Sequence, residues 1–238
     1  MYDCEVSDNE SGDNGGGVWL RGRGTFERCA FINNTTKGSG GGLLIRYVEP
    51  VTIVNCTFSG NAAASGLGDN VGGGGGLYSQ ENGSVYISNS TFTGNVIEGG
   101  SAKHKGGGIY SYNNNKTINM VLRSTVVSGN QGNTHGYDDV AGLFTGVTNC
   151  LITVTNGVAL PGENNIFERS AHLDALADNG GLTRTHALLS ASPAIDTGYN
   201  PLNLATDQRG VGYRRMRGEA VDMGAYEFSL FSTQIIIR

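Results

Sequence analysis

Two short clusters of ionisable side chains could carry chemistry. Lys103, His104 and Lys105 come before Gly108, and His135, Asp138 and Asp139 come before Gly142. Carboxylates can hold Ca²⁺ against an acidic sugar, and a lysine can remove the proton next to the sugar carboxylate. Counting back from the two glycines places His104 near Asp138 and Lys105 near Asp139. These clusters predict a small site for a uronate lyase, with Ca²⁺ as its candidate cofactor, but a solvated ion pair between two loops explains them as well.

Other catalytic patterns are poorly supported by the sequence. A glycoside hydrolase needs two or three carboxylates on one face, whereas Glu5 and Glu27 are the only acids within the strands expected below, and they belong to different strands. His186 lies in the C-terminal third, where a role in a cap is expected. The glycine runs lack the Lys-Ser/Thr pair of a phosphate-binding loop, and no serine-nucleophile motif is present.

The elements that would position these clusters are repeats. The pattern small–x–apolar–x–x–Asn begins at Cys4, Cys29, Cys56, Ser90 and Thr125, with a degraded copy at Cys150. A second pattern, glycine followed by an apolar strand, occurs at Gly17-Val18, Gly42-Leu43, Gly76-Leu77, Gly108-Ile109 and Gly142-Leu143. A third apolar column contains Phe26, Ile53, Ile87, Leu122 and Val147. Each period therefore holds three short strands.

Units with three short strands cannot bury a core alone, so they must stack. With coils about 4.8 Å apart, equivalent residues form columns along an interior axis. We predict an all-β fold, a right-handed parallel β-helix of the pectin-lyase-like type with about six coils in residues 1–159. Residues 160–228 are expected to form a C-terminal wrap or cap, and residues 229–238 a strand or tail.

Two columns have structural explanations. The asparagines at 9, 34, 61, 95 and 130 tolerate a left-handed turn and can hydrogen bond from coil to coil. The four cysteines share one small-residue column. Parallel stacking holds their Cβ atoms about 4.8 Å apart, outside the preferred range of about 3.5–4.5 Å for a disulfide. We therefore expect mostly buried free thiols, and zinc is not expected at such spacings.

An outward aromatic stripe follows from the same alignment. If Val18, Leu43, Leu77, Ile109 and Leu143 point inward, then Trp19, Leu44, Tyr78, Tyr110 and Phe144 point outward, one above another. Three explanations remain open for this apolar face. The C-terminal segment folds over it, or another chain packs on it, or sugar rings stack on it.

Composition excludes some function classes. The formal net charge of −5, with no basic run, disfavours nucleic-acid binding. No window of about 20 apolar residues could span a membrane, and "YDCEVSDNE" after Met1 is not a signal peptide. Because the first coil begins almost at Met1 without a polar cap, head-to-tail association with another copy is expected, with "TQIIIR" at the C-terminus as a candidate partner strand. The alternative is that an upstream region has been removed.

The C-terminal third carries motifs of its own. They are Asn179-Gly180-Gly181-Leu182, Ser192-Pro193-Ala194-Ile195-Asp196, Asp207-Gln208-Arg209-Gly210 and Asp222-Met223-Gly224-Ala225-Tyr226-Glu227. This region resembles the choice-of-anchor Q module of bacterial β-helix proteins, and the coils resemble the repeats of polymorphic outer-membrane and pectin-lyase-like proteins. The resemblance implies an exported or surface-displayed bacterial protein. No membrane segment or sorting motif follows Glu227, and the charged residues of the module are expected to form an ion-pair clamp.

The sequence favours a structural or adhesive role. We expect a rigid, secreted or surface-exposed solenoid that self-associates or contacts a polysaccharide. The alternative is a carbohydrate-active enzyme, either a polysaccharide lyase or a glycoside hydrolase. The candidate ligand-binding residues are the two loop clusters, and the candidate glycan platform is the aromatic stripe.

Overall fold

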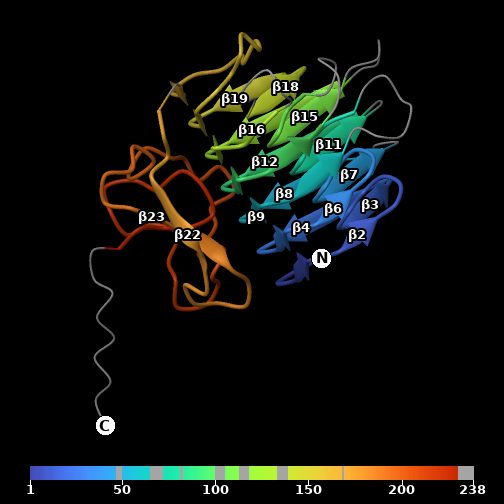
Figure 1. Cartoon of the computed structure of the whole chain (residues 1–238). Helices are drawn as coiled ribbons and strands as arrows, with labels where there is room; N and C mark the ends of the chain where they lie inside the picture. Colours follow the sequence, from blue (N-terminus) through green and yellow to red (C-terminus); the bar gives the residue numbers. More distant parts are fainter. Residues whose placement is uncertain are drawn as a thin grey trace.

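Short strands stack in register to form a β-helix. The computed structural model describes residues 1–46, 50–64, 72–80, 83–99, 105–112, 118–132, 139–167 and 169–229. Four parallel sheets run along the axis, and each successive strand in a sheet comes from the next coil of the chain (Figure 1). The described residues contain no α-helix. The predicted parallel β-helix is therefore confirmed.

Each sheet is named here after its first strand. The β1 sheet contains β1 (Glu5–Ser7), β5 (Ala30–Ile32), β9 (Thr57–Ser59), β13 (Thr91–Thr93), β17 (Val126–Ser128), β20 (Leu151–Ile152) and β21 (Ile166–Phe167). The β2 sheet contains β2 (Glu10–Ser11), β6 (Thr35–Thr36), β10 (Ala62–Ala64) and β14 (Val96–Glu98). The β3 sheet contains β3 (Val18–Arg21), β7 (Leu43–Arg46), β11 (Leu77–Gln80), β15 (Ile109–Tyr112) and β18 (Val140–Gly142). The β4 sheet contains β4 (Gly24–Glu27), β8 (Val51–Val54), β12 (Gly83–Ser88), β16 (Ile118–Arg123) and β19 (Gly146–Thr148).

The interior is a set of apolar columns. Phe31, Phe58 and Phe92 pair directly with one another in the β1 sheet. Their rings stack nearly parallel, with centroids 4.5 Å apart for the first pair and 4.4 Å for the second. The column predicted from Phe26 to Val147 is also in register through the β4 sheet. The sequence repeat thus corresponds to vertical neighbours in the core.

A fourth strand in each of the first four coils was not predicted. The strands of the β2 sheet follow the repeated asparagines directly, where the sequence suggested only a loop. Glycine is needed where the chain enters the β3 sheet, because successive coils approach closely there. A Cβ atom on Gly75 would lie 2.5 Å from the Val96 carbonyl oxygen and 2.6 Å from that of Gly107.

The repeated asparagines form a continuous ladder through the coils. Each side-chain oxygen accepts hydrogen bonds from the backbone N–H and the side-chain amide of the preceding asparagine, with N···O distances between 2.8 and 3.2 Å from Asn9 to Asn130. The predicted amide ladder is confirmed. The left-handed residue, however, is the one before each asparagine, for example Asn33 (φ 52°) or Gly60 (φ 65°), and not the ladder asparagine itself.

The cysteine column has a hydrogen-bonding role as well as a size requirement. Every side chain in it donates to the carbonyl two residues earlier: Cys4 to Tyr2, Cys29 to Glu27, Cys56 to Val54, Ser90 to Ser88, Thr125 to Arg123 and Cys150 to Thr148. The bond closes a turn whose middle residue has positive φ, such as Asn55 or Asn89. All four cysteines are free thiols, as predicted.

Replacing Cys56 by serine should therefore be nearly neutral. Serine keeps the donor to Val54 and an acceptor for the Cys29 N–H, which lies 3.4 Å from the Cys56 sulfur. Valine has a similar size but leaves that buried N–H without an acceptor, at a cost of about 1–3 kcal/mol. Chemical denaturation of the two variants measures the difference. Equal stability of Cys56→Ser and Cys56→Val would contradict this role.

The end of the solenoid formed by the last coil is covered by the residues that follow that coil. Val158 and Leu160 pack against the interior columns, and the Val147 N–H donates to the Pro161 carbonyl. The chain then adds β21 to the β1 sheet, which therefore continues to Phe167. The coils of the β-helix end at this point. Residues 169–229 lie outside the coils and are called the C-terminal module below. The module includes an antiparallel hairpin of β22 (Leu173–Ala177) and β23 (Thr185–Leu188).

Candidate functional site

The structure describes only two of the six residues of the loop clusters, Lys105 and Asp139. Lys103, His104, His135 and Asp138 lie outside the described residues. Lys105 is exposed, and its carbonyl accepts a hydrogen bond from the Gly74 N–H in the coil below. Asp139 lies in the interior, so the structure does not bring Lys105 and Asp139 together as the count from the glycines suggested.

Asp139 ends the asparagine ladder. Its Oδ1 accepts from the backbone N–H of Asn130 at 2.9 Å and from the Asn130 side-chain amide at 2.8 Å. Its Oδ2 accepts from the Val154 N–H at 2.8 Å. The side chain is fully buried, and this burial raises the pKa of Asp139 to about 6 in spite of the three N–H donors. Asp139 is thus a structural acceptor and is not available to a ligand in solvent.

The register of the fifth coil explains this position. Val140, not Leu143, pairs with Ile109, so Asp139 takes the place that Gly108 has in the coil below. As a result Phe144 packs in the interior and Leu143 is exposed. The prediction that Phe144 belongs to the outward stripe is wrong, because the apolar strand begins three residues before the position that Gly142 indicated.

The rest of the aromatic stripe does point outward but is mostly covered. Tyr78 and Tyr110 are only 2% and 7% exposed to solvent. Their rings pack edge to face, with centroids 5.4 Å apart, in a cluster with Leu44 and Ala141. Burial raises the pKa of Tyr110 to about 12. Their ring faces are therefore not available as a sugar platform.

Trp19 is the accessible aromatic residue of the stripe. It is 39% exposed, and the Arg21 guanidinium lies 4.7 Å from the centre of its ring. Arg46 occupies the same strand position as Arg21 in the next coil. An exposed indole with a guanidinium group beside it can stack on a sugar ring and attract its carboxylate.

The C-terminal module does not cover this stripe. It packs on the outer face of the β1 sheet, whereas β3, β7, β11 and β15 lie on the other side of the coils (Figure 1). Met223 and Ala194 share a core cluster with Val126 and Leu151 of the β1 sheet. The expected cover thus exists, but over a different sheet.

Hydrogen bonds join the module to every level of the solenoid. From the first coil to the last, the pairs are Glu5–Arg184, Arg28–Thr183, Asn55–Thr206, Thr57–Gln208, Ser59–His186, Thr91–Ala225, Asn89–Tyr199, Ser124–Tyr199, Ser128–Ala171 and Asn149–Thr197. We call this set the seam. Several of the solenoid partners are the positive-φ residues of the turns, whose side chains project toward the module. The module therefore straps six coils together.

A buried ion-pair clamp holds the C-terminal module together. The Arg209 guanidinium is paired with the fully buried Asp207 at 2.5 Å and donates to the Glu227 carbonyl at 2.7 Å. It lies 3.7 Å from the ring centre of Tyr226 and 4.2 Å from that of Tyr213. Charge, hydrogen bonds and ring faces therefore surround this arginine, as the clamp prediction required.

A second buried arginine completes the clamp. Arg215 lies 3.6 Å from Glu227 and donates to the Asp222 carbonyl. Burial lowers the pKa of Arg215 and raises the pKa of Asp222, and it raises the pKa of Glu227 to about 8. Both oxygens of Glu227 nevertheless accept backbone N–H groups, from Arg217 and Asp222. These acids hold the module's backbone in place.

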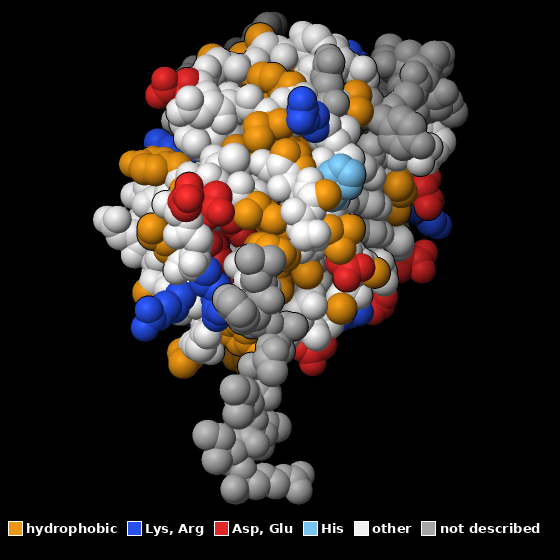
Figure 2. Space-filling model, turned by 90° about the vertical axis from the view of Figure 1, so that its left-hand side faces the viewer, with side chains coloured by type: hydrophobic (Ala, Val, Ile, Leu, Met, Phe, Trp, Pro, Cys, Tyr) orange, Lys and Arg blue, Asp and Glu red, His pale blue; other side chains and the backbone are white. Residues whose placement is uncertain are grey.

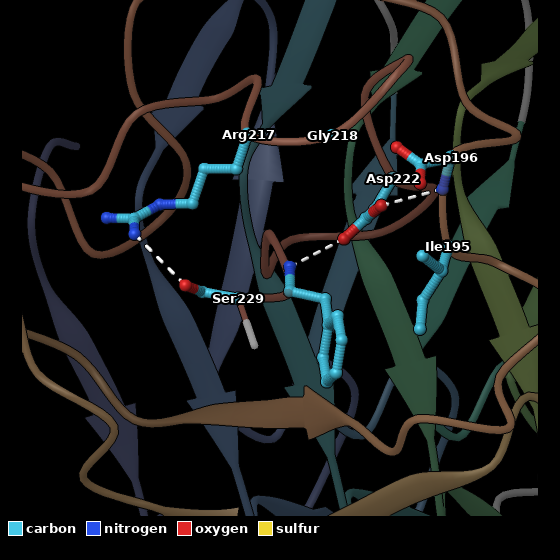
Figure 3. A pocket seen from close by; sticks show the side chains of 7 residues that line it. Ile195, Asp196, Arg217, Gly218, Asp222 and Ser229 are labelled. Carbon is cyan, nitrogen blue, oxygen red and sulfur yellow. Dashed lines mark hydrogen bonds between the residues drawn. The ribbon is translucent and has the colours of Figure 1, made fainter. Parts of the chain in front are cut away.

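A small cavity lies beside the clamp. It encloses about 200 Å³ and is lined by Ile195, Asp196, Arg217, Gly218, Asp222, Phe228 and Ser229 (Figure 3). Asp222 accepts from the N–H groups of Asp196 and Phe228, and Arg217 donates to Ser229, so its polar groups already have protein partners. Among the described residues, no three His, Cys, Asp or Glu side chains gather as metal ligands.

The outer surface of the module is mixed in character. Figure 2, which views this side, shows acidic and basic side chains close to one another, with apolar side chains between them. Val211 and Leu182, at the tips of two module loops, are among the most exposed apolar residues of the described chain. This face has no extended surface of one charge.

Comparison with known proteins identifies the family to which the solenoid belongs. A family model for the right-handed beta helix region matches residues 1–171, which are most of the chain and correspond closely to the stacked coils. Neither the curated proteins nor the solved structures include a match. No helix among the described residues has the length and apolar character needed to cross a bilayer. The chain therefore belongs to the right-handed beta helix family.

Proposed function

We propose that this protein is a structural or adhesive solenoid of the bacterial surface or exterior, and that its main role is not catalysis. One observation carries the proposal: the buried carboxylates of the described chain serve the fold. Asp139 holds the end of the ladder, and Asp207, Asp222 and Glu227 hold the clamp. An exported rod without disulfide bonds gains resistance to unfolding from such lateral fastening.

The resemblance to choice-of-anchor Q modules supports the same role. Its motifs coincide with the parts of the strap that make contacts. The Gly180-Gly181 turn lies against Tyr213 and Arg209, where a Cβ atom would clash, and Gln208 of the Asp-Gln-Arg-Gly motif reaches Thr57. We assign these motifs to fastening the module to the coils, and we propose a surface location on the strength of the resemblance.

Turnover assays separate this role from an enzymatic one. The protein would be incubated with a panel of neutral and acidic polysaccharides, and ultraviolet absorbance and reducing ends would be followed. We expect no turnover. Turnover that is lost on replacing His104 or Asp138 would instead establish the alternative function, a polysaccharide lyase or glycoside hydrolase using the loop cluster.

Glycan contact is a second candidate function, favoured by the exposed Trp19 with the Arg21 guanidinium beside its ring. Since Trp19 is the single tryptophan of the chain, its fluorescence reports binding directly. We expect acidic polysaccharides to shift this signal and Trp19→Ala to weaken retention on an acidic polysaccharide column about tenfold. Phe167→Ala removes an aromatic side chain of nearly equal exposure from the far end of the β1 sheet and is the control. Equal retention of both variants would contradict contact at Trp19.

Head-to-tail association is the remaining part of the proposal. Met1, Tyr2 and Trp19 are exposed on the first coil, and stacked strands are a natural template for further strands. Electron microscopy of concentrated protein tests this directly, with filaments as the expected result. A monomeric sedimentation profile at high concentration, unchanged by deletion of residues 229–238, would reject association.

A further inference from the structure

Three of the four cysteines lie directly above one another in successive coils. Cys4, Cys29 and Cys56 each come immediately before a strand of the β1 sheet (β1, β5 or β9), and these strands pair in register. Cys29 and Cys56 are fully buried, and Cys4 is half-buried. We call these three residues the thiol stack. Cys150 belongs to the same column but has Thr125 as its neighbour in the preceding coil, so it is not part of the stack.

The side chains of neighbouring cysteines share one orientation. Cys29 and Cys56 each donate to the carbonyl two residues earlier in the chain, that of Glu27 or Val54. Stacked side chains of one orientation keep the spacing of the coils, about 4.8 Å. The Cys29 N–H also points at the Cys56 sulfur, with the nitrogen 3.4 Å away. Ser90 makes the same turn-closing bond in the next coil, so the fold itself does not require sulfur at this position.

This spacing suits a soft metal ion that is bound by two thiolates in a line. Ion–sulfur bonds of about 2.3 Å, the length of a Zn–S bond, place two opposite thiolates about 4.6 Å apart. The spacing is too long for a disulfide, and zinc itself would need further ligands. Soft thiolates select soft ions such as Cu(I). A linear site needs only two ligands, whereas no three metal-binding side chains gather among the described residues.

Binding of such an ion leaves no buried backbone carbonyl without a donor. Two ion–sulfur bonds form, and the two thiol protons pass to solvent. The Glu27 carbonyl, which loses its thiol donor, still accepts from the Asp3 N–H. The Val54 carbonyl likewise still accepts from the Arg28 N–H. A divalent ion such as Hg(II) forms a neutral complex with two thiolates, so that no net charge enters the core.

We propose that the thiol stack is a binding site for a soft, two-coordinate metal ion, held between the sulfur atoms of neighbouring coils with Cys29 as the shared ligand. Cys29 has a thiol neighbour on both sides, Cys4 in one coil and Cys56 in the other. The half-buried Cys4 gives the ion a route to the buried thiols by ligand exchange. Because both thiolates are fixed on one scaffold, the second bond is intramolecular, and the pair binds the ion more tightly than two separate thiols do. This activity does not depend on the structural role proposed above.

Metal retention by the full chain, in competition with a monothiol, tests the site. One equivalent of Hg(II) is equilibrated with the reduced protein and an excess of a small monothiol, and the ion that stays with the protein is measured after ultrafiltration. We expect the unaltered protein to retain most of the ion. Bound ion should also raise the midpoint of thermal unfolding, because it binds the folded chain only.

Two serine variants, each with three remaining thiols, make the result specific. Cys29→Ser removes the shared ligand but keeps a donor for the turn, and retention should fall roughly tenfold or more. Cys150→Ser removes an equally buried thiol of the same column, whose neighbours are Thr125 and Asn165, and retention should not change. Equal retention by the two variants overturns the proposal, as does an unaltered protein that retains no more ion than Cys29→Ser.

A double variant keeps the test decisive if Cys29→Ser does not fold. Cys4→Ser combined with Cys56→Ser retains Cys29 but leaves it without a thiol neighbour. Circular dichroism without metal establishes which variants are folded. The double variant should lose retention as Cys29→Ser does, and undiminished retention in it would show that paired thiols are not the site.

Discussion

Replacing Asp139 by alanine is expected to lower the free energy of unfolding by about 3 kcal/mol or more. The change leaves the Asn130 N–H, the Asn130 side-chain amide and the Val154 N–H without an acceptor. Each buried donor that loses its partner costs about 1–3 kcal/mol. Urea denaturation followed by circular dichroism measures the loss, which should appear as a lower midpoint with an unchanged slope.

Asp139→Asn is the matched control. The asparagine oxygen can still accept from Asn130, as it does at every earlier coil, and only the bond to Val154 is replaced by two facing donors. We expect Asp139→Asn to lower the free energy of unfolding by roughly a third of the loss in the alanine variant. Because the pKa of Asp139 is raised to about 6, the unaltered protein loses stability as the pH rises from 3.8 to about 6, and the asparagine variant should not show this loss. An alanine variant as stable as the unaltered protein would show that Asp139 does not terminate the ladder.

Removing the Asp207 carboxylate should have a similarly large effect, confined to the module. Asp207→Ala leaves the Arg209 guanidinium buried beside two tyrosine rings, and it removes an acceptor from the N–H groups of Arg209 and Glu227. Breaking a buried pair from one side costs about 3–5 kcal/mol. Hydrogen exchange should show the loss at the module and seam amides, while the ladder amides keep their protection.

The control for this variant is Glu219→Ala, which removes an exposed acid of the same module. Its effect should be within about 0.5 kcal/mol of zero, as for an ordinary surface substitution. If Asp207→Ala were as mild as Glu219→Ala, the clamp would not hold the strap. If it lowered protection equally in the ladder, the module and the coils would unfold as one unit.

The fold was predictable because stacking repeats the same physical requirement in every coil. An aromatic or branched residue at the position of Phe58 must match its neighbours above and below, so the pattern recurs and can be aligned by eye. The left-handed turns and the close approach at the glycines add further markers. The strands of the β2 sheet were missed because residues such as Ala62–Ala64 and Thr35–Thr36 have no marked apolar alternation.

The alignment failed where a coil departed from the pattern. In the fifth coil Asp139 replaces the glycine before the apolar strand, and Gly142 lies later in the same strand. Counting from Gly142 therefore shifted the register by three residues and turned Phe144 outward. The nine-residue separation between Asn130 and Asp139, followed by the apolar Val140, is the signal that could have corrected it.

The docking face of the module could not be read from the sequence. Most of the seam contacts join residues more than 100 positions apart, such as Thr57 with Gln208, and no repeat relates the two segments. The motifs did indicate a compact unit with an ion-pair clamp, because buried charges need partners. The Thr and Ser residues on the outer face of β9 and β13 are a weak signal, since outward polar residues are also common on faces that contact only water.

A nuclear Overhauser experiment on methyl-labelled protein tests the central claim, that the module straps the outer face of the β1 sheet. The structure predicts cross-peaks from the Met223 methyl to Val126 and Leu151, and from the Ala225 methyl to Thr91. Cross-peaks from the same module methyls to Leu44 or Tyr78 of the β3 sheet, in place of these, would contradict it.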